Sequence, residues 1–140
     1  MFSQDPLQTT TYLLQKIVKT QRCLMDSALN RINLHVGQEK LLMELWQEDG
    51  LTQTELALRL RITSPTLSKM LSRLENIKLL EKRKDGLDAR VSRIFLTNKG
   101  RSFQKPVTEL WLSLEETMLS KLSLDEHLLF RRLLSKIHEH

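Results

Sequence analysis

The chain has 140 residues, a length typical of one domain with its own hydrophobic core. Its hydrophobic fraction of 40% and charged fraction of 28% are those of an ordinary soluble protein and exclude a disordered or membrane protein. No apolar run approaches the roughly 20 residues that a bilayer span requires, and the first residues lack the basic and apolar regions of a signal peptide. A single cysteine cannot form an internal disulfide, so we expect a cytoplasmic protein.

The net charge of +5 is unevenly distributed along the chain. Residues 51–105 contain 13 Lys and Arg against 5 Asp and Glu, whereas the remaining residues contain 9 against 12. A basic segment within a folded domain indicates a polyanionic partner such as nucleic acid, although a solvated charged surface is the plainer alternative.

The first part of the chain predicts two helices. Asp5-Pro6 has the N-cap and first-turn proline of a helix start, and apolar residues at helical spacing extend this first, long helix to about Ile32. A second helix follows the His35-Val36-Gly37 stretch and ends at Asp49-Gly50.

Two short helices joined by residues 61–63 then predict a helix-turn-helix. The first of them begins with a capping box formed by Thr52 and Glu55. At this helix start we expect Thr52 and Gln53 to contact DNA. An ordinary helical hairpin shows the same pattern, so the motif needs support from the elements that follow it.

The second helix of this pair has a distinctive polar face. Ser64 is its predicted N-cap and Pro65 its first residue. Opposite a narrow apolar stripe it carries short hydroxyls, one amide and two cations but no acidic residue, and such groups reach base edges and phosphates. The predicted DNA-binding residues of this recognition helix are Ser64, Pro65, Thr66, Ser68, Lys69, Ser72, Arg73 and Asn76.

Residues 82–100 change from helical periodicity to alternation, with a turn at Asp85-Gly86. They predict a two-stranded hairpin in which Ile94 and Leu96 share the face that covers the two helices. A helix-turn-helix backed by such a ribbon is a winged helix, so the predicted fold class is mostly α with a small β-hairpin. The basic tip of the wing projects away from the core, and its predicted DNA-binding residues are Arg83, Lys84, Asp88, Arg90 and Arg93.

The C-terminal region predicts further amphipathic helices. Pro106 lies within what would be one long helix, so we expect either a kink there or a later start. With the first helix, these segments are too apolar to remain exposed, which favours a homodimer over packing within one chain. The expected domain organisation is an N-terminal dimerisation helix (1–33), a winged helix-turn-helix DNA-binding domain (34–104) and C-terminal dimerisation helices (105–140), the last of which starts with a capping box at Ser123 and Glu126.

Several segments resemble, in this order, the MarR family of bacterial transcription regulators: LTQTELALRLRIT, SPTLSKMLSRLE, and the D-x-R and LTxxG motifs at 88–90 and 96–100. The resemblance implies a homodimer whose terminal helices form a shared helical domain, while each chain presents one winged helix. It also implies that Asp88 orients Arg90, which would enter the minor groove. The family usually has glycine where Lys78 stands, and if that turn needs a positive φ, lysine costs roughly 1 kcal/mol.

These motifs and the resemblance predict a sequence-specific regulator in a bacterial or archaeal cytoplasm, associated with the nucleoid and not with a membrane. We expect a repressor that binds a pseudo-palindromic operator in double-stranded DNA as a homodimer. The resemblance implies release by oxidation or by a small aromatic or phenolic ligand. Because pockets favour domain junctions, we expect such a ligand to bind where the second helix meets the first and fifth. The alternative is a winged-helix protein-interaction module without sequence-specific DNA binding, but the recognition helix lacks the apolar anchors that such a module needs.

Other chemistry is sparse in this sequence. The four histidines have no spacing that indicates a metal site, and no nucleophile or paired carboxylate indicates an enzyme, so we expect neither catalysis nor a cofactor. Cys23 lies opposite the apolar stripe of the first helix, near the cations Lys19 and Arg22, which makes it a candidate redox sensor. A structural or incidental cysteine is the favoured alternative.

Overall fold

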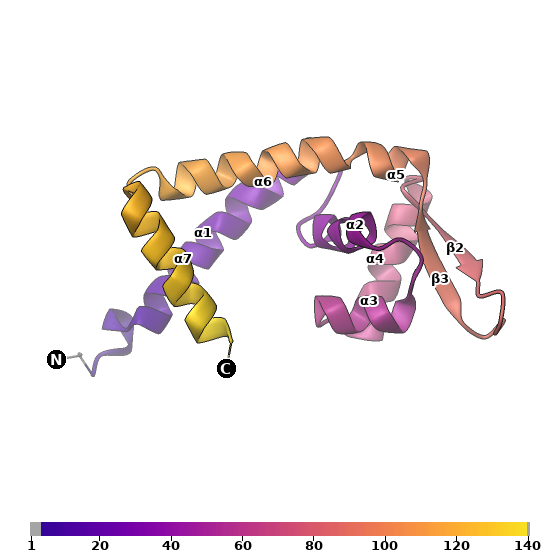
Figure 1. Ribbon diagram of the computed structural model, residues 1–140, viewed down its shortest axis with the longest axis horizontal. Coiled ribbons are helices and arrows are strands. Elements are labelled where there is room, and N and C mark those ends of the chain that lie inside the picture. Colours follow the sequence, from indigo (N-terminus) through magenta and orange to yellow (C-terminus); the bar gives the residue numbers. More distant parts are fainter. Residues whose placement is uncertain (1–3, 140) are drawn as a thin grey trace. The chain divides into compact units, whose positions relative to one another are not determined.

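A computed structural model describes residues 4–139 of the chain, most of them helical (Figure 1). These residues divide into two compact units: a winged unit of residues 26–108, and a helical unit formed by residues up to Met25 together with those from Glu109 onward. None of the described helices is both long enough and apolar enough to cross a membrane. The elements in chain order are the 3-10 turn η1 (Pro6–Gln8), α1 (Thr10–Asn30), α2 (Gln38–Gln47), β1 (Leu51–Thr52), α3 (Gln53–Leu60), α4 (Ser64–Asn76), β2 (Leu80–Lys84), β3 (Ser92–Leu96), α5 (Asn98–Ser102), α6 (Gln104–Leu119) and α7 (Leu124–His138).

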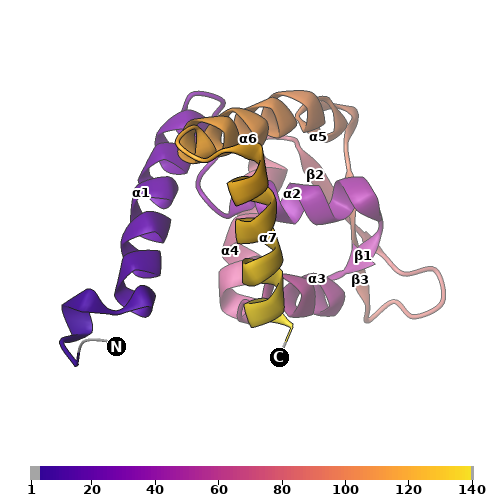
Figure 2. The ribbon, with the colours of Figure 1, turned by 60° about the vertical axis from the view of Figure 1, so that its left-hand side comes forward.

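The winged unit has its own hydrophobic core and confirms the predicted winged-helix fold class. Helices α2, α3 and α4 pack together beside an antiparallel sheet with strand order β1-β3-β2 (Figure 2). In β3, Ile94 pairs with Leu51 of β1 and Leu96 pairs with Leu80 of β2. Ile94 and Leu96 are 0% and 4% exposed, which confirms the inward face predicted for the hairpin. Strand β1 is an addition to the prediction, because two residues are too few to show alternation.

Prolines lie near the starts of two helices, α1 and α6, and both helices begin later in the chain than the sequence predicts. Asp5 caps only the short turn η1, where its carboxylate accepts the N–H of Leu7, and α1 begins at Thr10. Helix α6 begins at Gln104, after the separate short helix α5, and Pro106 lies in its first turn. A late start, and not a kink, therefore accommodates this proline, because the first-turn N–H groups have no intrahelical partner to lose.

The N-cap of α4 is Thr63 and not Ser64, a shift of one residue from the prediction. Thr63 has extended backbone angles, and its hydroxyl accepts the N–H of Thr66. Proline is tolerated throughout a first helical turn, so the proline of this helix does not determine which of two adjacent hydroxyl residues is the cap. The N-caps predicted at Thr52 and Ser123 are confirmed, the second with a complete capping box.

The LTxxG motif joins the wing to the rest of the winged unit. Leu96 is buried, and the hydroxyl of Thr97 caps α5 by accepting the N–H of Gly100 at 3.0 Å. A Cβ on Gly100 would lie 2.2 Å from the carbonyl oxygen of Leu79, so only glycine fits this close approach. The carbonyl of Gly100 in turn accepts the indole N–H of Trp46 at 3.0 Å. The motif therefore connects α2, α5 and the start of β2.

Lys78 ends the recognition helix in a left-handed conformation. Its φ is 67°, and its N–H donates to the carbonyl of Glu75 at 2.9 Å. The carbonyls of this turn are also satisfied: Thr97 donates its hydroxyl to Lys78 O at 2.6 Å, and the Lys99 ammonium donates to Ile77 O at 2.9 Å. The positive φ anticipated for this turn is present, and a side chain with a Cβ occupies it.

Replacing Lys78 by glycine should therefore stabilise the protein. Glycine adopts a left-handed φ without the Cβ clash, so Lys78→Gly should raise the free energy of unfolding by roughly 1 kcal/mol. Chemical denaturation of wild type and variant measures this difference. Asn76→Gly, two residues earlier in helical conformation, is the control and should lower stability by roughly 0.3 kcal/mol. Equal destabilisation by both glycines would contradict the role assigned to φ.

Glu39 is a carboxylate buried near the start of α2. Its side chain is 0% exposed; Oε1 accepts the N–H of Gly37 at 2.5 Å, and Oε2 has no hydrogen-bond partner. Burial disfavours the charged form and raises the pKa of Glu39 above its ordinary value of 4.5, an effect only partly opposed by the bond from Gly37.

The free energy of unfolding should consequently depend on pH through the titration of Glu39. Because the folded-state pKa is raised, this residue's favourable contribution is present below about pH 4.5, the unfolded value, and is lost as pH rises through the folded-state pKa. Glu39→Gln removes the charge, so its unfolding free energy relative to wild type should increase from pH 4 towards neutrality, by on the order of 1 kcal/mol. Denaturation at several pH values measures this, with Glu109→Gln on an exposed position of α6 as the matched control. A difference independent of pH would contradict the assignment.

Candidate DNA-binding and dimerisation surfaces

Helix α4 has one buried stripe, and its opposite face is polar. Leu67, Leu71 and Leu74 are at most 1% exposed and pack into the core of the winged unit. The preceding helix, α3, ends at Leu60 and is followed by its C-cap Arg61, whose left-handed φ of 54° turns the chain towards α4. This burial leaves the opposite face of α4 open to solvent.

Seven of the eight residues predicted for the recognition helix lie exposed on that face. The one acidic residue of α4, Glu75, is half-buried and lies 3.8 Å from the ammonium of Lys82 in β2, so the exposed face carries no carboxylate. Lys69 supplies its cation. The exposed residues are Ser64, Pro65, Thr66, Ser68, Lys69, Ser72 and Asn76.

Arg73, the eighth predicted residue, is half-buried and engaged within the protein. Its Nη1 donates to the side-chain oxygen of Gln38 at 2.6 Å. Its Nη2 donates to the main-chain and side-chain oxygens of Asn33, at 3.2 and 3.1 Å. The guanidinium is thus directed to the connection between α1 and α2.

Thr52 and Gln53, predicted at the start of α3, are both half-buried. The hydroxyl oxygen of Thr52 accepts the N–H of Glu55 at 3.1 Å, so Thr52 caps the start of α3. Thr52 also pairs with Arg93 in the sheet. Their position connects the helix-turn-helix to the wing strands.

A second arginine, Arg93, holds the base of the wing. Its Nε donates to Asp85 at 2.7 Å, and its Nη1 donates to the carbonyl of Gly50 at 2.9 Å. The other carboxylate oxygen of Asp85 accepts the N–H groups of Leu87 and Asp88, at 3.3 and 3.1 Å. The bond from Arg93 is the main cause that lowers the pKa of Asp85. Asp85 therefore orders the turn at the wing tip while Arg93 ties that turn to the sheet.

Asp88 and Arg90 form the contact that the family resemblance implies. Asp88 Oδ1 accepts the main-chain N–H and the Nε of Arg90 at 3.0 and 3.2 Å, and Oδ2 accepts Nη2 at 3.4 Å. This bonding to Arg90 lowers the pKa of Asp88 and keeps the carboxylate charged. The Arg90 side chain nevertheless remains 92% exposed, on a loop that extends away from α2–α4 (Figure 1).

Arg83 lies within strand β2 and not at the wing tip, where the hairpin was predicted to place it. Its guanidinium stacks 4.3 Å from the centre of the Phe95 ring, which lies diagonally across on β3, and it pairs with Glu81, two residues earlier on the same face of β2. Lys84 ends the strand and is exposed. Leu87, which sequence reasoning did not single out, is 99% exposed at the tip.

The helical unit exposes most of its apolar side chains. Every buried hydrophobic side chain of the described residues except Met25 belongs to the winged unit. Conversely, only Leu58 and Leu87 of the large exposed hydrophobic side chains lie in the winged unit. Those of the helical unit are Leu7, Leu13, Ile17, Val18, Leu24, Leu112, Leu124, Leu128, Leu129, Leu133, Leu134 and Ile137.

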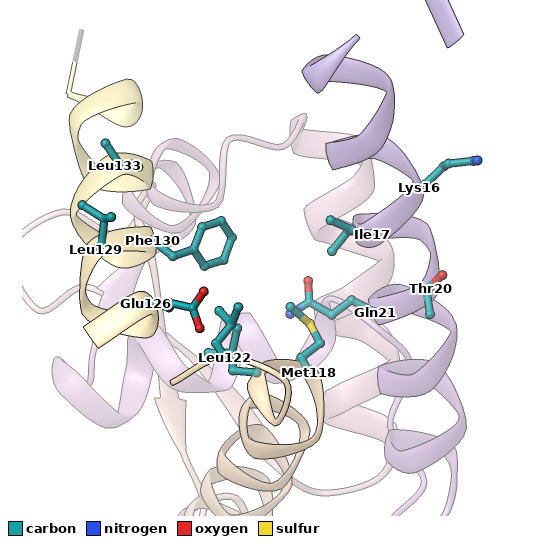
Figure 3. Close-up of a pocket in the computed structure, with 11 residues that line it drawn as sticks. Lys16, Ile17, Thr20, Gln21, Met118, Leu122, Glu126, Leu129, Phe130 and Leu133 are labelled. Atoms are coloured by element: carbon teal, nitrogen blue, oxygen red, sulfur yellow. The ribbon is translucent and has the colours of Figure 1, made fainter. Parts of the chain in front are cut away.

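A pocket of about 660 Å³ opens among α1, α6 and α7 within the helical unit. Figure 3 shows Phe130 of α7 and Ile17 of α1 directed towards the same space, with Met118 and Leu122 at its base. Most of the lining is apolar; the polar residues around it are Lys16, Thr20, Gln21 and Glu126.

Cys23 lies exposed on α1 and is the only cysteine of the chain. Its exposure agrees with its predicted place opposite the apolar stripe, while its role as a redox sensor stays a prediction. Within residues 4–139, no group of three or more His, Cys, Asp or Glu side chains is arranged to hold a metal ion.

Known proteins similar to this chain are transcription regulators. A sequence model of the MarR family matches residues 34–92. The HTH-type transcriptional regulator TtmR of Methylorubrum extorquens is 38% identical over 78 residues, which span 56% of this chain and 40% of that regulator. The crystal structure of an S. aureus MepR–DNA complex is similar with a TM-score of 0.83 and 32% identity, over 92% of this chain and 96% of MepR. A crystal structure of MarR has a TM-score of 0.83 and 25% identity, over 96% of both chains.

Proposed function

Because the chain belongs to the MarR family of transcription regulators, we propose that it is a repressor that binds double-stranded DNA in a sequence-specific manner. The observation that carries this proposal is the exposed, acid-free face of α4 together with a wing that presents Arg90 at 92% exposure. MepR, which is 32% identical, forms a complex with DNA in its crystal structure.

The two elements have different tasks in this proposal. Thr66, Lys69 and Ser72 on α4 meet base edges and adjacent phosphates in the major groove, where each base pair presents a distinct pattern of donors and acceptors. Arg90 enters the minor groove, whose narrow A·T-rich segments concentrate negative potential. Asp88 limits the rotamers of Arg90, which reduces the entropy lost on binding.

We further propose that the helical unit forms a homodimer with a second copy of the chain. Its exposed leucines and the open pocket of Figure 3 provide apolar surface that a folded monomer rarely leaves in water. A symmetric dimer presents two α4 helices to two half-sites about one helical turn, roughly 10 bp, apart. The operator is therefore pseudo-palindromic.

We infer from the family resemblance that a small aromatic or phenolic ligand, or oxidation, releases the protein from DNA. The exposed Cys23 is the candidate for the oxidation. A ligand can act only by binding the DNA-competent and incompetent states with different affinities. Intact induction in Cys23→Ser together with a lost peroxide response would assign the sensing role to this cysteine.

Selection of bound sequences from a random DNA pool tests the proposed function directly. The wild-type chain should enrich a motif with two related half-sites. Failure to enrich any motif, with a correctly folded protein, would favour the alternative of a protein-interaction module, for which the exposed Leu58 and Leu87 would be the apolar anchors.

Substituting Arg90 should weaken binding without changing the preferred sequence. Arg90→Ala loses one well-placed arginine contact, so affinity for the selected operator should fall roughly 5- to 150-fold, and the slope of log K against log salt should decrease by nearly one. Asp88→Ala should give a smaller loss, because the arginine is then disordered but still present. Binding titrations at several salt concentrations measure both effects.

Lys69→Ala and Ser72→Ala are the matched comparison on α4. Because they change major-groove contacts, they should redistribute the preferred bases in the selection experiment. A new consensus produced by Arg90→Ala, or wild-type affinity of that variant at moderate salt, would contradict the geometry proposed for the wing.

The dimer should depend on the apolar face of α7. The double variant Leu129→Glu, Leu133→Glu places two charges on side chains that are 52% and 48% exposed in the single chain. If a partner covers them, the dissociation constant of the dimer should rise at least roughly 100-fold, so that light scattering reports the 16.4 kDa of one chain.

Leu58→Glu is the control for this experiment, since Leu58 is 73% exposed on α3 in the winged unit and should leave the dimer intact. A wild-type chain that is monomeric and monodisperse, or a double variant that remains dimeric, would refute this interface.

A further inference from the structure

Arg73 is placed differently from the other cations of the predicted DNA-binding surface. Whereas Lys69 is exposed, the Arg73 guanidinium makes three hydrogen bonds to the connection between α1 and α2. Gln38, which accepts the shortest of them, is only 5% exposed. The guanidinium of arginine is a planar fork of donors that can match several fixed acceptors at once. The ammonium of lysine has no such geometry.

The acceptors of Arg73 are themselves held in place. Gln38 Oε1 also accepts the main-chain N–H of His35 at 3.0 Å. The Gln38 side chain therefore binds both the α1–α2 connection and Arg73. Asn33 has a left-handed φ of 63°, a conformation that asparagine tolerates better than most residues. Its main-chain and side-chain oxygens both accept Nη2 of Arg73. The four residues Asn33, His35, Gln38 and Arg73 are named here the arginine bracket.

We propose that Arg73 is a positioning residue for DNA binding: through the arginine bracket it fixes α4 against the connection between α1 and α2, and it does not itself contact DNA. This inference rests on the proposed function. Arg73 lies one turn after Lys69 and next to Ser72 on α4, so a change in how the helix is held at this point displaces the side chains that read the operator.

The rival role for Arg73 is a direct contact with a DNA phosphate. Three variants distinguish this role from the positioning role, because the two roles predict opposite results. Arg73→Ala removes the fork, Arg73→Lys keeps the charge without the fork, and Gln38→Met removes the buried acceptor at similar volume. A charge at a phosphate is largely replaced by lysine, whereas a matched fork is not.

The experiment is a double-mutant cycle of operator binding at several salt concentrations. Arg73→Ala, Arg73→Lys and Gln38→Met should each weaken binding by a similar factor, roughly 5- to 30-fold. The double variant Arg73→Ala, Gln38→Met should be no more than about twofold weaker than either single variant, and the salt slope should remain that of wild type. Gln38→Glu, which keeps an acceptor for the guanidinium, should bind within about threefold of wild type.

Several outcomes would overturn the positioning role. Additive effects of Arg73→Ala and Gln38→Met, a salt slope reduced by about one in Arg73→Ala, or recovery of affinity by Arg73→Lys would each assign Arg73 to a phosphate. Wild-type affinity in both alanine and methionine variants would show that the bracket does not set the position of α4.

The same variants keep the inference separate from the proposed function. Amide hydrogen exchange of α4 without DNA should show faster opening in Arg73→Ala and in Gln38→Met, again with no further increase in the double variant. A wild-type chain that binds no operator would refute the proposed function and with it the role of Arg73. Specific binding by wild type with uncoupled variants would refute the role of Arg73 alone.

Discussion

The winged unit depends on one close approach of two backbones, where Gly100 lies against the carbonyl of Leu79. A Cβ at Gly100 would lie 2.2 Å from that oxygen, so no residue other than glycine fits at position 100. The same carbonyl accepts the N–H of Thr97 at 3.0 Å, and Thr97 in turn donates to Lys78. The turn after the recognition helix, the residue before β2 and the start of α5 are thereby held together.

The charged side chains of the winged unit divide into those that build the surface and those that it presents. Arg93 joins Asp85 to Gly50, and Arg73 joins α4 to Gln38. These bonds occupy two of the five N–H donors of Arg93 and up to three of those of Arg73, and they hold both guanidinium groups against the protein. Lys69 on α4 and Arg90 beside Asp88 are left exposed, and a side chain whose rotamers are already limited loses less conformational entropy on binding. The basic residues of this segment are therefore not equivalent, because some of them bind acceptors within the protein.

This division also explains which parts of the site could be predicted from the sequence. The helix-turn-helix and the hairpin follow from local signals, namely apolar periodicity, caps and the Asp85-Gly86 turn, and these are confirmed. The hydrogen-bond partners of an arginine, in contrast, can lie far away in the sequence. Arg73 is 35 residues from Gln38, and Arg93 is 43 residues from Gly50, so no helical projection could show that their guanidinium groups face protein acceptors. The requirement for Gly100 is equally non-local, although its LTxxG motif was visible in the sequence.

The two units differ in how their stability arises. The winged unit buries nearly all the apolar side chains that the described residues bury, so its core is complete within one chain. The helical unit has well-formed helix signals, including the capping box of Ser123 and Glu126, yet caps contribute only about 1 kcal/mol each and cannot replace a core. If a second chain supplies the missing cover, as proposed, then the folding of α7 and the assembly of the dimer are one equilibrium, and the stability of this unit varies with protein concentration. The spacing of the two recognition helices is then determined by the same apolar contacts that fold the helical unit. A ligand that perturbs those contacts needs no direct access to DNA in order to change DNA binding.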